Sequence, residues 1–329
     1  MKKIFFLLLS IIFILSCGNG KIEKKNIEVQ ENNEKVQLRY IFPDGLPALS
    51  ILSLFSEKKQ FDEKTYINYE KITTIETLMG ELVKNNENII AIVPSNLAAQ
   101  LYNKNFGYQI LGTVSWGSLY IVSSEGMSSI EDLKGKKIGI MGRGQTPDIV
   151  FRNILSKNNI DPEKLDIQYY NSGTELANAL LSGVIKTAVL SEPNVSVVTE
   201  KNNNIKIIAS LNDEWKKLYS TEYGFPQATL IAKKEIIEKY PDLIKKLTDE
   251  MKKQDVWLKT SKDTEKYLET AKMPIPPKVI PLVIQKANIK FLDISDTESE
   301  YENYYKILFD FEPKTIGGKV PESSIFNEK

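Results

Sequence analysis

The chain has 329 residues, 42% of them hydrophobic, which is enough apolar material for two packed domains. It contains no histidine, the side chain that most often transfers protons near neutral pH and most often binds zinc, so we predict no metal site and no cofactor. The 43 basic residues balance 43 acidic ones, which argues against a nucleic-acid partner because such a partner requires a basic face.

The first residues have the order of an export signal. Lys2 and Lys3 precede an apolar run over residues 4–15, which is shorter than the roughly 20 apolar residues of a membrane-spanning helix. The run ends in the sequence ILSCG, in which Cys17 is the only cysteine of the chain. This stretch resembles the lipobox of bacterial lipoproteins, in which the cysteine is lipidated, although Leu15 is bulkier than the small residue usual at that place.

Residues 1–16 are accordingly predicted to be a signal peptide, and Cys17 to carry a lipid that anchors the exported protein to the cell membrane, facing the periplasm or the cell exterior. A plain cleaved signal is the alternative. Residues 17–35 are polar and charged, which is typical of a flexible tether. Loss of Lys2 and Lys3 with the signal leaves 41 basic residues against 43 acidic ones. With Cys17 lipidated, no thiol remains for a disulfide or for cysteine catalysis.

From residue 36 onward, short apolar strands alternate with amphipathic helices. In the first half, the predicted strands are residues 36–42, 66–72 and 89–93, and residues 108–123 hold a long run of strand-forming residues with Gly112 and Gly117 inside it. The predicted helices follow residue 45 and cover residues 74–84 and 94–101. In the second half, the predicted strands are residues 136–141, 165–170, 187–190, 205–211 and 227–232, and the predicted helices cover residues 147–157 and 174–181 and follow residue 190. From residue 234 to the end the pattern is mostly helical. Two such series predict two α/β lobes, each a parallel-rich sheet covered by helices on both faces.

In open parallel sheets, ligands bind beyond the carboxyl ends of the strands, so each strand-to-helix junction is a candidate binding segment. The predicted ligand-binding residues lie in these junctions and in the segments that join the lobes: Phe42, Asp44, Gly45, Leu46, Pro47, Ser95, Asn96, Trp116, Gly144, Gln145, Thr146, Pro147, Asp148, Asn171, Ser172, Glu192, Pro193, Phe225 and Gln227. No catalytic residue is predicted.

The junction at residues 142–148 has the strongest local signals. Thr146 is suited to cap a helix, because its hydroxyl can accept a free backbone N–H, and Pro147 is suited to the first helical position. Gly142 and Gly144 allow the backbone to approach a ligand closely. A helix start of this kind favours an anion or a carbonyl oxygen, but an ordinary helix start without a ligand explains the same residues equally well.

The ordered set of segments resembles a periplasmic binding protein of the two-lobed second type, and within that class the nitrate, sulfonate and thiamine-precursor branch of transporter receptors. The stretches that carry the resemblance are IEDLKGKKIG at residues 130–139, GQTP at residues 144–147, LLSGVIKTAV at residues 180–189, Glu192-Pro193, and FPQAT at residues 225–229. Together they span most of the chain after the tether.

The resemblance implies an α/β fold of type 2 whose two lobes close around one small-molecule solute in the cleft between them. It also implies that the protein, as a monomer, delivers this solute to an ABC permease in the membrane. The expected division is lobe 1 at residues 36–122 and 227–329, and lobe 2 at residues 123–226. The hinge is expected near residues 118–124 and 224–227, where the chain crosses between the lobes.

The chemistry of the junctions bears on the solute. Asp44, Asp148 and Glu192 lie beside aromatic side chains, which favours a neutral or cationic organic solute with a flat ring over a small inorganic anion. Arginine is scarce, so Arg143 is the main candidate partner for an anion. Two other functions stay open. One is an enzyme of cofactor biosynthesis on the same fold, against which stand the export signal and the lack of a nucleophile–base pair. The other is a surface lipoprotein that binds a macromolecule.

Overall fold

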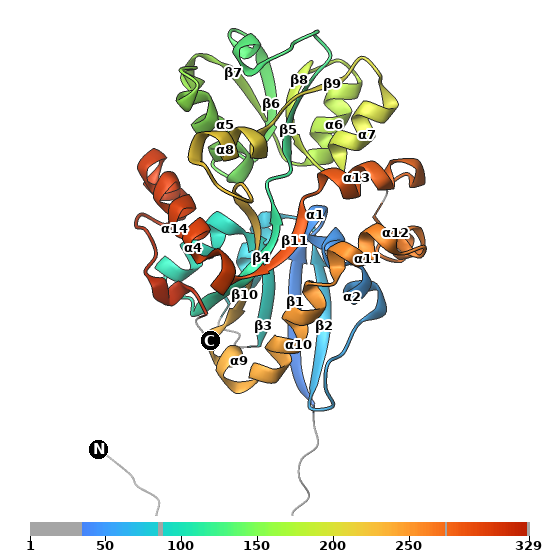
Figure 1. The fold of residues 1–329 in the computed structure, drawn as a ribbon, viewed down its shortest axis with the longest axis vertical. Coiled ribbons are helices and arrows are strands. Elements are labelled where there is room, and N and C mark those ends of the chain that lie inside the picture. The colour runs from blue at the N-terminus through green and yellow to red at the C-terminus, as the bar shows by residue number, and fades with distance from the viewer. Residues whose placement is uncertain (1–34, 85–87, 274, 328–329) are drawn as a thin grey trace, which may run out of the picture. The chain divides into compact units, whose positions relative to one another are not determined.

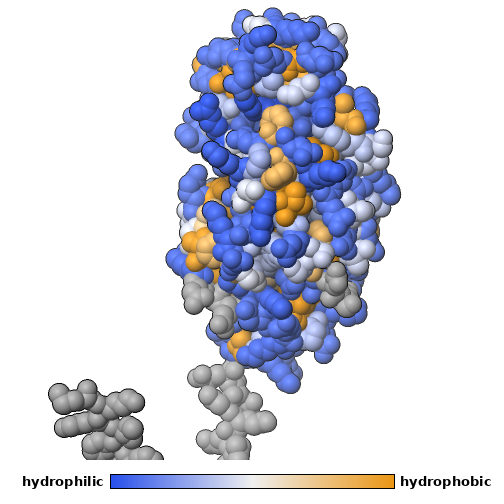
Figure 2. Space-filling view, turned by 90° about the vertical axis from the view of Figure 1, so that its left-hand side faces the viewer, coloured by the Kyte–Doolittle hydropathy of each residue, from blue (hydrophilic) through white to orange (hydrophobic). Residues whose placement is uncertain are grey.

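The computed structural model describes residues 35–84, 88–273 and 275–327. The predicted signal peptide, Cys17 and nearly all of the predicted tether therefore lie outside the described residues. Within the described ranges, no helix is both long and apolar enough to cross a membrane. Hydrophilic residues cover most of the face shown in Figure 2, and the hydrophobic residues on it form small scattered groups.

A six-stranded sheet, drawn in the lower half of Figure 1, has the strand order β11-β4-β10-β3-β1-β2. Its strands are β1 (Val36–Pro43), β2 (Thr65–Ile72), β3 (Ile89–Pro94), β4 (Tyr108–Trp116), β10 (Pro226–Lys233) and β11 (Ile289–Asp293). β3 has five consecutive fully buried apolar residues, which is the pattern of a central strand covered on both faces. β1, β2 and β3 are parallel, whereas β10 is antiparallel to both β3 and β4.

Helices cover both faces of this sheet. One face packs against a hydrophobic cluster that includes side chains of α3 (Ile75–Leu82), α4 (Ser95–Asn103) and α14 (Ile294–Phe311). The other face packs against α1 (Leu46–Leu49), α2 (Leu52–Glu57), α9 (Lys234–Lys239), α10 (Pro241–Met251), α11 (Gln254–Thr260), α12 (Thr264–Thr270), the 3-10 helix η3 (Pro277–Val279) and α13 (Ile280–Lys286). After α14, η4 (Pro313–Ile316) and η5 (Ser323–Ile325) run along α4 and β4.

A five-stranded sheet has the order β7-β6-β8-β5-β9. Its strands are β5 (Leu119–Ser123), β6 (Lys137–Met141), β7 (Asp166–Tyr170), β8 (Thr187–Ser191) and β9 (Lys206–Ser210). α5 (Thr146–Lys157) and α8 (Leu211–Tyr219) lie on one face, and α6 (Gly173–Leu181) and α7 (Asn194–Lys201) on the other. The short helices η1 (Ile130–Leu133) and η2 (Pro162–Lys164) complete this part of the fold.

The α/β architecture with two helix-covered sheets is confirmed, and two elements were not predicted. β11 lies within a region predicted as mostly helical, and α8 was not predicted. Both sheets are mixed and not purely parallel, because β10 and β11 pair antiparallel with β4, and β5 pairs antiparallel with β8 and β9. The run of strand-forming residues over 108–123 is two strands in different sheets, separated by Gly117 and Ser118.

Candidate ligand-binding site

The two sheets present their strand ends to each other. At one edge of the six-stranded sheet, the register places Pro94 beside Ala228, and Pro226 beside Trp116. In the five-stranded sheet, Leu119 is paired with Ser191. Only two residues separate the end of β4 from the start of β5, so these two edges are adjacent in space. The predicted strand-to-helix junctions therefore face one region between the sheets.

Two predicted residues meet directly across this region. The hydroxyl of Thr146, at the start of α5, donates a hydrogen bond to the side-chain oxygen of Asn96 in the first turn of α4, at 2.9 Å. Asn96 in turn donates to the carbonyl of Thr315 in η4, at 3.2 Å. The predicted capping role of Thr146 is wrong: the helix begins one residue earlier, Gln145 occupies the cap position, and the Thr146 hydroxyl is used between the sheets.

A chain of buried hydroxyls lies behind this contact. Ser95 is hydrogen bonded to Thr229 at 2.6 Å, Thr229 to Tyr301 at 2.7 Å, and Tyr301 to Thr113 at 3.1 Å. Tyr304, one turn along α14, has a buried hydroxyl without a hydrogen bond of good geometry. Burial raises the pKa of Tyr304, and the nearby Thr146 hydroxyl opposes the shift. These groups fix the first turn of α4 on the six-stranded sheet.

The crossing between the sheets is tightly constrained. The backbone N–H of Ser118 donates to the side-chain oxygen of Gln227 at 2.7 Å. Asn288, before β11, donates to the carbonyl of Gly117. A Cβ on Gly117 would lie 2.4 Å from atoms of both Asn212 and Phe225, so this position requires glycine. Gln227 thus links both crossing segments.

Trp116 ends β4 at the same place. Its ring lies 5.0 Å from the ring of Tyr223, and its indole N–H is buried without a partner among the residues that the structure describes. The hydroxyl of Tyr170, at the end of β7, is likewise buried and unpaired. A buried donor without an acceptor costs free energy, so each of these two groups lacks a compensating hydrogen bond within the described residues.

The predicted acids already have partners within their own sheets. Asp44 accepts the N–H of Gly45 at 2.9 Å and forms a 3.2 Å ion pair with Lys71. Asp148 accepts the N–H of Gly144 at 2.8 Å and the hydroxyl of Tyr169 at 3.0 Å. Both carboxylates therefore already accept hydrogen bonds within their own sheets.

Arg143 has an aromatic neighbour. Its guanidinium lies over the ring of Tyr169, 5.1 Å from the centroid, and the residue is exposed. The cation–π contact keeps the side chain beside β7. Arg143 thus remains an available cation at this edge of the five-stranded sheet.

Glu192 is 1% exposed at the end of β8. Its carboxylate accepts the hydroxyl of Ser196 at 2.9 Å and the backbone N–H of Ser196 at 3.3 Å. Burial raises the pKa of Glu192 to about 7, against the lowering effects of Ser196 and of Lys286 from α13. Tyr120 lies near Glu192: burial raises the pKa of Tyr120, and the charge of Glu192 adds to this shift. The Tyr120 hydroxyl donates to the carbonyl of Lys286 at 2.9 Å. This acid is therefore buried beside a contact between the two sheets.

The other predicted residues have varied settings. Phe42 and Phe225 are fully buried in the hydrophobic clusters, so their rings support the strand ends from inside. Asn171 and Ser172 are exposed, and Ser172 caps α6 by accepting the N–H of Glu175 at 3.1 Å. Leu46 is buried, and the half-buried residues are Gly45, Pro47, Gln145, Pro147 and Pro193.

Several side chains at the crossing were missed from the sequence. They are Ser118, Tyr120, Asn212, Tyr223, Lys286, Asn288 and Tyr304. Ser118, Tyr223 and Asn288 lie just before strands, and the other four lie inside β5, α8, α13 and α14. Among the residues that the structure describes, no group of three or more His, Cys, Asp and Glu side chains could hold a metal ion.

Comparisons with known proteins agree with this architecture. Residues 110–254 match the family model described as NMT1/THI5 like, so this stretch of the chain is NMT1/THI5-like. YtlA of Bacillus subtilis, named as a binding protein, is 28% identical over 159 residues, which are 47% of this chain and 45% of YtlA. A protein of Brucella abortus, also named as a binding protein, is 27% identical over 39% of this chain and 37% of its own length. The chain thus matches less than half the length of these curated relatives.

Solved structures match over nearly the whole described chain. An ABC transporter protein from Parabacteroides distasonis has a TM-score of 0.76 and 24% identity, covering 90% of this chain and 100% of that one. The alkanesulfonate-binding protein SsuA from Xanthomonas axonopodis, bound to MOPS, has a TM-score of 0.63 and 14% identity over 88% and 96% of the two chains. The nitrate-binding protein NrtA from Synechocystis has a TM-score of 0.60 and 12% identity over 89% and 87%. The fold is therefore that of the type 2 periplasmic binding proteins.

Proposed function

We propose that this chain is the solute-binding protein of an ABC importer, which captures a small organic molecule between its two sheets and delivers it to a membrane permease. The observation that carries the proposal is the contact of strand-end residues from both sheets, above all the hydrogen bond from Thr146 to Asn96. The names of YtlA, a binding protein, and of the Parabacteroides ABC transporter protein support a binding and transport role over an enzymatic one.

Binding proceeds by hinge closure in this proposal. The chain crosses between the sheets at Gly117-Ser118 and returns at Gly224-Phe225, and we place the lobe boundaries at these two points. A solute that contacts both edges favours the closed arrangement in proportion to the contacts that it makes only there. Opening breaks the Asn96–Thr146 and Tyr120–Lys286 hydrogen bonds, so the closed arrangement has its own stabilising contacts.

The proposed solute is a neutral aromatic or heterocyclic molecule that carries hydrogen-bond acceptors. The unpaired donors of Trp116 and Tyr170 favour acceptor atoms on the solute, and Trp116 and Tyr223 supply aromatic surface. Because Asp44 and Asp148 are already paired, a cationic solute is less well matched than the sequence indicated.

A thermal-shift screen of the chain from residue 18 tests this proposal. Its panel sets pyrimidines, nucleosides and aromatic amines against nitrate, sulfonates and carboxylates. A ligand at a hundred times its dissociation constant stabilises the folded state by about 2.7 kcal/mol. We expect a shift from a ring compound. A shift from small anions alone would overturn the ligand class, and no shift from any compound, with ligand-free protein, would overturn the receptor role.

We further propose that Cys17 is lipidated and holds the protein at the extracytoplasmic face of the membrane. Replacing Cys17 by serine removes the thiol that accepts the lipid. We expect the Cys17→Ser protein to move from the membrane fraction to the soluble extracytoplasmic fraction. Unchanged membrane association of this variant would contradict the anchor.

A further inference from the structure

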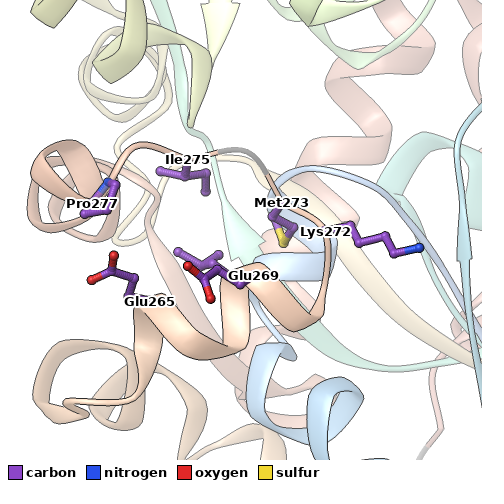
Figure 3. Close-up of a pocket in the computed structure, with 7 residues that line it drawn as sticks. Glu265, Glu269, Lys272, Met273, Ile275 and Pro277 are labelled. Atoms are coloured by element: carbon purple, nitrogen blue, oxygen red, sulfur yellow. The ribbon is translucent and has the colours of Figure 1, made fainter.

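Two exposed glutamates lie on α12 (Thr264–Thr270). Glu265 and Glu269 are spaced four residues apart, which places them on one face of the helix, where like charges destabilise it. Neither carboxylate forms an ion pair with a lysine or arginine in the described part of the chain. Lys272, three residues after Glu269, points away from both of them in Figure 3.

A cavity of about 500 Å³ adjoins this face of α12. Its lining residues are Glu265, Leu268, Glu269, Lys272, Met273, Ile275 and Pro277. In Figure 3 the carboxylates of Glu265 and Glu269 extend into the space below Ile275 and Pro277. None of the lining residues belongs to the strand-to-helix junctions, so this cavity is separate from the site proposed above.

The apolar part of the lining is preformed. Leu268, Met273 and Ile275 are 2%, 6% and 8% exposed, so their side chains are held in place by the surrounding core. An apolar wall with two carboxylates at its rim matches a molecule that is apolar at one end and positively charged at the other. A bare divalent ion fits less well, because the described residues offer only two carboxylates here.

We propose that this cavity binds a small amphipathic organic cation, such as a primary or quaternary amine with an alkyl or aryl group. The apolar group packs against Leu268, Met273 and Ile275, and the charged nitrogen lies between Glu265 and Glu269. The site is additional to the proposed transport function and does not depend on it.

Titration calorimetry of the full chain with benzyltrimethylammonium tests the site, with benzyl alcohol and benzenesulfonate as neutral and anionic comparisons. We expect binding of the cation alone. The double variant Glu265→Gln with Glu269→Gln should weaken it at least about fivefold, because each exposed charge pair contributes modestly. The control Glu298→Gln with Glu302→Gln makes the same charge change at the same spacing on α14 and should leave the affinity within about twofold.

Three results would overturn the proposal. The first is no binding to the unmodified chain at about 10 mM probe, well above the millimolar range of the weakest specific ligands. The second is equal binding by the Glu265 and Glu269 double variant. The third is a loss of affinity for benzyltrimethylammonium in the Thr146→Ala variant that is as large as in the Glu265 and Glu269 double variant, because the probe would then bind between the sheets. If Thr146→Ala weakens binding of the transported solute and leaves the affinity for benzyltrimethylammonium unchanged, the result supports two separate sites.

Discussion

The carboxyl of Glu192 lies at the end of β8, where burial raises its pKa from 4.5 to about 7. In the unfolded chain this group ionises at the lower value. Between these two values the folded state retains the proton that the unfolded state has lost. The free energy of unfolding therefore decreases as the pH rises through this window, and the full loss is present above about pH 7.

The variant Glu192→Gln keeps the shape of the side chain and removes its titration. We expect the variant to gain up to about 3 kcal/mol of stability relative to the unmodified protein between pH 5 and pH 8. Urea unfolding at both pH values measures this difference. Glu302→Gln, on an exposed part of α14, is the control and should show no such gain. If the difference in the free energy of unfolding between the Glu192→Gln variant and the unmodified protein is the same at pH 5 and pH 8, the raised pKa of Glu192 is contradicted.

Glycine is required at position 117 because of the side chains that surround it and not because of its backbone angle. An added methyl group would lie 2.4 Å from Asn212 Oδ1 and from the ring of Phe225, so one of the two crossing segments must shift. We expect Gly117→Ala to lower the free energy of unfolding by about 1–3 kcal/mol, the usual cost of overpacking. Gly80→Ala is the matched control: it is inside α3 with nothing within 4 Å, and should be neutral or stabilising. Equal effects of the two substitutions would contradict this account.

The sequence predicts which residues lie at the candidate site better than it predicts which side chains they contact. Asn96 and Thr146 were both predicted as site residues, but their hydrogen bond joins elements 50 residues apart and depends on how two sheets meet. Asp44 and Asp148 were candidates either for contact with a solute or for a local turn and helix start, and the structure gives them the partners Lys71 and Tyr169. Such pairings cannot be predicted from strand-end position alone, because several neighbouring side chains compete for each carboxylate.

Among the secondary-structure elements, the strands with long apolar runs were predictable and β11 was not. β11 has only five residues, and its alternation is limited to buried Ile289, exposed Lys290 and buried Phe291. It pairs only with β4, over a register shift, and Gly112 of β4 allows its close approach, since a Cβ there would lie 2.4 Å from the carbonyl of Leu292. The strand thus depends on tertiary contacts that local sequence does not contain.

α8 was missed for a different reason. Its sequence, LNDEWKKLY, is mostly polar, and only Leu211, Asn212 and Trp215 are buried. The available signal was at its start, where Ser210 caps the helix by accepting the N–H of Asp213. The helix buries Trp215, whose ring centroid lies 5.5 Å from that of Phe225 and 5.7 Å from that of Tyr304. A helix that covers the five-stranded sheet thus also packs against α14.

The C-terminal segment is held on β4 and α14 by a small number of contacts. Phe326 is 4% exposed, its ring packs edge-on against Tyr301, and the N–H of Asn327 donates to Ile110 at 3.0 Å. We expect Phe326→Ala to cost about 3–5 kcal/mol and to increase hydrogen exchange at Asn327. Val320→Ala in the same segment, where the side chain is 39% exposed, should change neither. Unchanged exchange in Phe326→Ala would show that the segment is held elsewhere.

For the molecule as a whole, the contact between the sheets can be measured without knowing the solute. A double-mutant cycle with Asn96→Ala and Thr146→Val isolates the energy of their hydrogen bond from the other contacts of each side chain. We expect a coupling energy of about 0.5–1.5 kcal/mol in urea unfolding, as for a typical buried hydrogen bond. A coupling energy of zero would mean that the sheets are apart in solution when no solute is bound.

The order of strands along the chain also bears on how the protein is made. All five strands of the smaller sheet come from residues 119–210, whereas the larger sheet uses residues from Val36 to Asp293. During synthesis, the smaller sheet can form once residue 210 has emerged, while β4 still has an open edge until β11 is complete. The unit that interrupts the sequence of the larger sheet is thus the one able to fold first. A chain shortened before residue 289 leaves Gly112 and its neighbours as an exposed strand edge, which is a site for aggregation.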